Sequence, residues 1–208
     1  MARPLPLGGV IGFSGTVPGG MVLHPDGVTL IYALGTCIIL RHKGDEKSQE
    51  FLHGHSHKIS CLSLSKSGRY LATGQATYMG FIADIIIWDV ESRKLLHRLT
   101  LHKVKVQALH FSCDEDFLAS IGGQDDGKLV IWNVKTGRAV CGSPTPFDYA
   151  QSVCFFNTTS TKLVTAGSSK LNVWDFDNQN RKVRPSDCHL GHIKRVLQTI
   201  VSEKAGKE

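Results

Sequence analysis

The sequence lacks the features that define several common classes of protein. Its six cysteines stand singly, without a CxxC pair, which argues against both a zinc ribbon and a compact disulfide framework. No apolar run approaches the roughly 18 residues of a membrane span. The short, proline-rich segment 1–8 also lacks the apolar run of a secretory signal peptide. These absences favour a cytosolic protein without a membrane partner.

Catalytic motifs are lacking as well. The sequence contains no phosphate-binding GxxxxGK[ST], no dinucleotide-binding GxGxxG, no GxSxG nucleophile elbow and no HExxH. His53, His55 and His57 stand at alternate positions, as metal ligands on an extended strand would, but no Cys, Asp or Glu nearby completes a ligand set. We therefore expect no enzyme activity, no cofactor, no metal and no small-molecule substrate.

What the sequence does contain is an internal repeat. Trp88, Trp132 and Trp174 are separated by 44 and 42 residues, close to the length of one propeller blade. Each Trp ends a short apolar run with the composition of a buried strand, and two further strand patterns precede each run. Turns rich in Gly, Asp and Ser separate these strands. Each repeat is therefore predicted to be a small antiparallel sheet.

The repeats resemble the WD-repeat family, whose Gly-His signal stands here at Gly54-His55 and again at Gly191-His192. The resemblance implies a hydrogen-bonded chain of His, Ser or Thr, Asp and Trp inside each blade. Such a chain is structural and not catalytic, because it satisfies buried polar groups and fixes strand register. The implied residues are His55, Thr73 and Trp88 in the second unit, His102, Ser120, Asp126 and Trp132 in the third, and Thr165 and Trp174 in the fourth.

Only the third unit matches all four positions of the family chain. In the second unit the segment 75–84 lengthens the turn, which makes Asp84 a poor match for the family aspartate. The fourth unit lacks the His and the Asp. An earlier, degenerate unit has no Trp at the expected place, as is common for terminal repeats.

The predicted fold is all-β, an incomplete WD-repeat propeller of about four blades plus one strand of a fifth. A ring of seven blades needs roughly 300 residues, and this chain has 208. The predicted units are a degenerate blade at about 9–53, blades at 54–101, 102–145 and 146–190, the start of a next blade at 191–201, and a tail at 202–208.

A narrower resemblance is to the N-terminal propeller of cilia- and flagella-associated WD-repeat proteins, carried by the segments 9–18, 31–35, 74–89 and 141–144. The extended turn within 74–89 matters most, because most WD repeats are too tight there to hold it. This resemblance implies a non-catalytic scaffold in the cytoskeleton of motile cilia or flagella. It would be a microtubule inner protein that stabilises axonemal doublet microtubules, with tubulin and other inner proteins as partners.

Two other functions remain open from the residues. A WD-repeat chain is equally suited to a soluble adaptor in a signalling, trafficking or ubiquitin-ligase complex. The net charge of +6 permits an acidic partner, but nucleic-acid binding, which would be sensitive to salt, is not favoured. A basic cluster near the junction of the fourth and fifth units would suit an acidic partner or a solvated loop. Its members are Arg181, Lys182, Arg184, Lys194 and Arg195.

Overall fold

The computed structural model describes residues 9–10, 12–13, 15–45, 48–145, 150–168, 170–188 and 200. These residues form four antiparallel sheets of four strands each, and within every sheet the strands follow one another in chain order. The same ranges contain no helix that is long and apolar enough to cross a membrane.

The first sheet contains β1 (Met21–Leu23), β2 (Thr29–Leu34), β3 (Cys37–His42) and β4 (Gln49–His53). The second contains β5 (Ile59–Leu64), β6 (Tyr70–Gln75), β7 (Ile82–Asp89) and β8 (Lys94–Lys103). The third contains β9 (Val106–Phe111), β10 (Phe117–Gly122), β11 (Lys128–Asn133) and β12 (Arg138–Pro144). The fourth contains β13 (Ala150–Phe155), β14 (Lys162–Gly167), β15 (Leu171–Asp177) and β16 (Lys182–Cys188).

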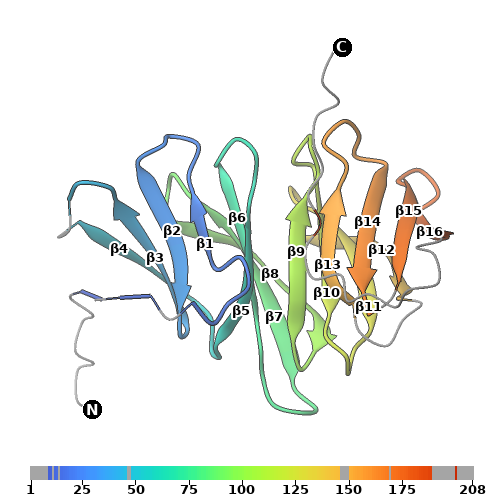
Figure 1. Ribbon diagram of the computed structural model, residues 1–208, viewed down its shortest axis with the longest axis horizontal. Coiled ribbons are helices and arrows are strands. Elements are labelled where there is room, and N and C mark those ends of the chain that lie inside the picture. The colour runs from blue at the N-terminus through green and yellow to red at the C-terminus, as the bar shows by residue number, and fades with distance from the viewer. Residues whose placement is uncertain are drawn as a thin grey trace.

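The four sheets stand side by side, and the inner strands of neighbouring sheets contact one another. The first strand of the third sheet, β9, contacts the first strands of both neighbours, β5 and β13. In Figure 1 the strands β1 and β13 lie toward the middle of the view, whereas β4 and β16 lie at its left and right edges. This is the fan arrangement of propeller blades, in which successive sheets pack face to face.

The apolar core lies between neighbouring sheets, in three clusters, and the second and third sheets contribute side chains from both of their faces. Along β7, Ile86 and Trp88 pack in the cluster shared with the first sheet, whereas Ile85 and Ile87 pack in the cluster shared with the third. This alternation is the period of two expected for a strand with two buried faces. The tryptophans of the second, third and fourth sheets all point back toward the preceding sheet.

The hairpins between the third and fourth strands have a repeated turn. The side chain of Asp89 accepts hydrogen bonds from Ser92. In the next two sheets the side chain of Asn133 accepts hydrogen bonds from Thr136, and that of Asp177 accepts them from Asn180. Each turn then places a residue at positive φ, namely Arg93 at 59°, Gly137 at 65° and Arg181 at 51°. Side chains of the Asp and Asn type stabilise such turns by binding the backbone two or three residues ahead.

The all-β class, the WD-type propeller architecture and the four sheets are confirmed. Most of the predicted fifth-unit strand at 191–201, and the tail at 202–208, lie outside the described residues. The sheets span residues 21–53, 59–103, 106–144 and 150–188. His102, expected as the first residue of the third blade, therefore lies in β8, the outer strand of the second sheet, because that strand continues to Lys103 before the chain crosses over.

Candidate functional site

The third sheet contains a completely buried chain of four polar side chains. His102 lies with Nδ1 2.5 Å from Oδ2 of Asp126 and with Nε2 2.7 Å from Oγ of Ser120. The indole N–H of Trp132 donates to the same Ser120 oxygen at 2.7 Å. His102 thus reaches from β8 of the second sheet into the third, and the chain joins the two sheets.

The geometry of Asp126, His102 and Ser120 is that of a hydrolytic triad, in which a histidine bridges a carboxylate and a hydroxyl. Its environment is not. The side chains of His102 and Asp126 are 0% and 1% exposed, and Ser120 is fully buried. The indole N–H of Trp132 also donates a hydrogen bond to the Ser120 hydroxyl, the group that would act as the nucleophile. A substrate has no access to this oxygen, so the arrangement is suited to holding structure.

The second sheet has the same chain with a different fourth member. Nε2 of His55 lies 2.7 Å from Oγ1 of Thr73, to which the indole of Trp88 donates at 2.8 Å. Nδ1 of His55 lies 3.0 Å from Oε1 of Gln75, a buried residue that the sequence interpretation missed. Asp84, the poor match, instead forms an ion pair with Arg98 at 2.6 Å.

Burial sets the protonation of His55. Removal of its imidazole from water lowers the pKa of His55 from 6.5 to about 4, with a further lowering by Arg98. The hydrogen bond to Gln75 and the charge of Asp84 act in the opposite direction and are outweighed. His55 is therefore neutral at pH 7, and its Nδ1–H donates to the Gln75 amide oxygen.

The other two sheets hold less of the chain. In the fourth, Trp174 donates to Oγ1 of Thr165 at 2.8 Å. In the first, Arg41 stands opposite Leu30 at the register position where Trp88 stands opposite Leu71. The degenerate character of the first unit is thus a replacement of the anchoring indole by a guanidinium.

The three alternating imidazoles do not meet at one point. His53 lies 3.2 Å from Sγ of Cys37, His55 is directed to Thr73 and Gln75, and His57 packs edge-on against the Tyr78 ring. Among the described residues no group of three or more His, Cys, Asp or Glu side chains is placed to hold a metal ion.

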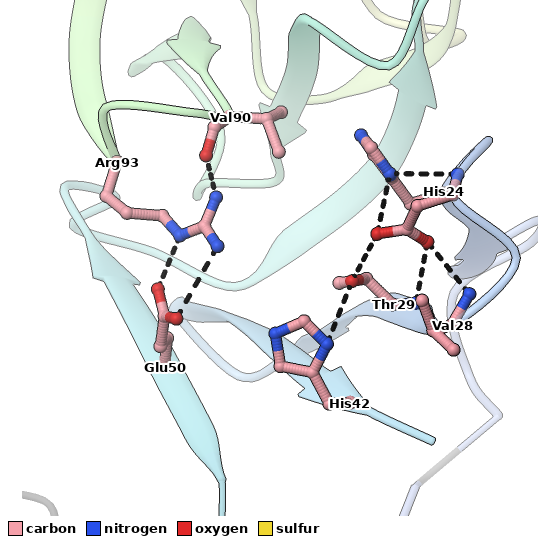
Figure 2. A network of polar contacts seen from close by, with 8 residues as sticks. His24, Val28, Thr29, His42, Glu50, Val90 and Arg93 are labelled. Atoms are coloured by element: carbon pink, nitrogen blue, oxygen red, sulfur yellow. Dashed lines mark hydrogen bonds and ion pairs between the residues drawn. The ribbon is translucent and has the colours of Figure 1, made fainter.

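A groove of about 470 Å³ runs between the first and second sheets. Figure 2 shows polar contacts at this groove, among them those made by the lining residues Thr29, His42 and Arg93. The hydroxyl and backbone N–H of Thr29 and the N–H of Val28 donate to Asp26, which places the pKa of that carboxyl well below its usual range. Arg93, from the turn after β7, pairs with Glu50 of β4 and donates to the carbonyl of Val90. The groove is therefore a polar joint between sheets.

Turns of neighbouring sheets touch at further points. The carboxylate of Glu115, in the turn after β9, accepts bonds from the N–H and the hydroxyl of Ser67, in the turn after β5. Gly68, with φ +84°, lies so close to His24 that an added Cβ would be 2.3 Å from Nε2 of that ring. Nε2 of His97, on the outer strand β8, lies 3.1 Å from the carbonyl oxygen of Lys135 in the turn between β11 and β12.

The extended turn between β6 and β7 presents apolar side chains to solvent. Tyr78, Met79, Phe81 and Ile82 are all exposed, and the turn projects beyond the ends of the neighbouring strands in Figure 1. In contrast, Arg181, Lys182 and Arg184 of the basic cluster lie exposed along the β15–β16 hairpin. Lys194 and Arg195, the other two members, lie outside the described residues.

Known proteins resemble the chain in both sequence and fold. The family of the WD domain, G-beta repeat matches residues 46–77 and 93–133. Cilia- and flagella-associated protein 52 of Chlamydomonas reinhardtii is 60% identical over 97% of the chain, and its Homo sapiens counterpart is 45% identical over 94%. The chain spans about a third of the length of these relatives, 33% and 32%. A solved structure of U3-55K matches 87% of the chain, and the chain covers 54% of it, with a TM-score of 0.69 and 22% identity.

The repeats, the radial sheets and the two matched segments together show WD40 repeats arranged as propeller blades. Nearly the whole chain is homologous to the N-terminal part of Cilia- and flagella-associated protein 52. The resemblance predicted from the segments 9–18, 31–35, 74–89 and 141–144 is thereby confirmed. The likeness to U3-55K, at 22% identity, concerns the fold alone.

Proposed function

We propose that this chain is a non-catalytic scaffold that stabilises the doublet microtubules of motile cilia or flagella from within their lumen. The observation that carries the proposal is the 60% identity, over 97% of the chain, to a protein whose name associates it with cilia and flagella. Tubulin and other inner proteins of the doublet are the proposed partners.

The architecture supports a mechanical role. Sheets are joined through apolar clusters and through the buried chains of His102 and His55, so neighbouring blades form a continuous packed body. A hydroxyl, an imidazole and a carboxylate do come together in the third sheet, but they are closed to solvent. The polar chemistry of the chain is thus used inside the fold, and its surface is left for contacts with partners.

Tagging the endogenous protein and extracting axonemes with detergent and then with high salt tests the proposal. We expect retention in the doublet fraction, because a luminal protein held by shape resists screening of its charges. We also expect little protein in cells that lack motile axonemes. Complete release with the soluble matrix would contradict the luminal location and favour a soluble WD-repeat adaptor.

A further inference from the structure

The three most exposed large apolar residues of the described chain lie in one turn. Met79 is 83% exposed, Tyr78 74% and Phe81 62%, and the next residue, Ile82, is 53% exposed. Leu101, on the neighbouring strand β8, is 52% exposed. Single exposed apolar residues are ordinary, but a contiguous group on a protruding turn is characteristic of an interaction site.

Backbone hydrogen bonds hold this turn in one conformation. The N–H of Phe81 donates to the carbonyl of Tyr78 at 3.1 Å, and Gly80, with φ +88°, provides the left-handed residue that such a turn requires. The N–H of Thr77 donates to the carbonyl of Val104 at 2.6 Å, and the N–H of Val104 donates to the carbonyl of Phe81 at 2.9 Å. The apolar side chains are thus preorganised, which lowers the entropy lost on binding.

Three lysines border the turn. Lys103 stands opposite Ile82 in the β7–β8 ladder. The carbonyl of Lys58 accepts a hydrogen bond from the N–H of Ala76, and Lys105 forms an isolated β-bridge with Ala76. None of these three ammonium groups lies within 4.0 Å of a carboxylate in the described part of the chain. A partner at this turn therefore meets apolar side chains bordered by uncompensated positive charge.

We infer that the tip formed by Tyr78, Met79, Phe81 and Ile82 is a docking element that inserts into an apolar recess of an acidic protein surface. The inference rests on the proposed function, under which that surface is the wall of the doublet microtubule. The apolar side chains provide the buried contact, and the lysines complement its negative charge and raise the association rate.

Binding of the 208-residue chain to purified doublet microtubules, measured by cosedimentation, tests the inference. The double variant Met79→Ser, Phe81→Ser should bind at least about tenfold more weakly, the size expected when anchor residues leave an interface. The matched control is Leu95→Ser, Leu96→Ser, at the other end of β8, where both side chains are also exposed. That control should bind like the wild type, and thermal melts of both variants should match the wild type.

Charge is tested separately with Lys103→Glu, which should weaken binding and reduce its dependence on salt, against Lys94→Glu as the control. If the wild type is retained and the Met79, Phe81 variant binds equally well, the docking inference is wrong while the proposed function stands. If the wild type itself is not retained, both are wrong. Binding of the wild type, but not of that variant, to vesicles of phosphatidylcholine and phosphatidylserine would assign the tip to a membrane and overturn the inference.

Discussion

Gln75 lies with Oε1 3.0 Å from Nδ1 of His55, at the place in the second sheet that Asp126 fills beside His102 in the third. An amide oxygen thus replaces a carboxylate in an otherwise repeated chain. The replacement keeps the hydrogen bond to the imidazole without burying a second charge, which would be costly in a site this dry.

Substitution of Gln75 by Ala should lower the free energy of unfolding by about 1–3 kcal/mol, because the buried N–H of His55 loses its acceptor. Asp84→Ala is the matched control. It removes only a partly exposed ion pair with Arg98, worth about 1 kcal/mol or less. Urea unfolding of the two variants measures the difference. A larger loss of stability at Asp84 than at Gln75 would show that Asp84 is the fourth member of the hydrogen-bonded chain of His55.

Trp88→Ala and Trp132→Ala should destabilise by similar amounts, about 3–5 kcal/mol each. From the sequence the second sheet is the weaker of the two, since Asp84 is displaced. With Gln75 completing the chain, both indoles are buried and both donate to a hydroxyl, at 2.8 and 2.7 Å. Denaturant titrations of the two variants provide the test, and a much milder loss at Trp88 would contradict it.

Stability should fall as the pH is lowered from about 6.5 to 4. The unfolded chain takes up a proton at His55 near pH 6.5, whereas burial holds the folded pKa at about 4, so acid favours the unfolded state over this window. The loss from His55 approaches about 3 kcal/mol at the acid end. Burial lowers the pKa of His110 as well and acts in the same direction. His55→Asn should show a shallower pH dependence than the wild type; identical slopes would exclude His55 as the source.

Ser120 should not react with a fluorophosphonate probe while the protein is folded. Its hydroxyl oxygen is hydrogen-bonded to His102 as in a hydrolase, yet Ser120 is buried and accepts a hydrogen bond from Trp132. Intact-mass spectrometry after incubation should show no adduct. Labelling at Ser120 under native conditions would reveal access that the fold denies, and would reopen the question of catalysis.

Gly68→Ala should destabilise by about 2 kcal/mol or more, because it combines a left-handed backbone with a clash against His24. Gly35→Ala is the matched control: its φ is +60°, but an added Cβ meets nothing within 4 Å. It should therefore lose only about 1 kcal/mol. Addition of His24→Ala should recover part of the loss at Gly68, and thermal unfolding of the double variant shows whether it does.

The strands and the repeat can be predicted from the sequence because they depend on local patterns of apolar residues. The apolar run 85–88 and its counterparts identify the strands, and the spacing of Trp88, Trp132 and Trp174 identifies the repeat. The chain of His102, Ser120 and Trp132 follows from family resemblance, and the structure brings these side chains together.

What the sequence conceals depends on contacts between distant turns. Gln75 escapes notice because an amide at that position is not part of the family pattern, although its place two residues after Thr73 was a usable signal. The sequence places Met79 and Phe81 in the lengthened turn 75–84, but apolar character alone does not tell whether such a turn folds inward or projects into solvent. The hydrogen bond between Ser67 and Glu115 joins residues 48 positions apart, and no local sequence pattern predicts it.

The strand β7 carries the exposed Ile82 at one end and the buried Trp88 near the other. Tension applied at the tip therefore travels lengthwise along β7, and the ladder bonds that join β7 to β8 lie across the direction of pull. Hydrogen bonds under such a shear load are stretched together, so they resist collectively and do not break one after another. Under the proposed function, this placement lets the docking tip bear repeated loads while the sheet behind it stays folded.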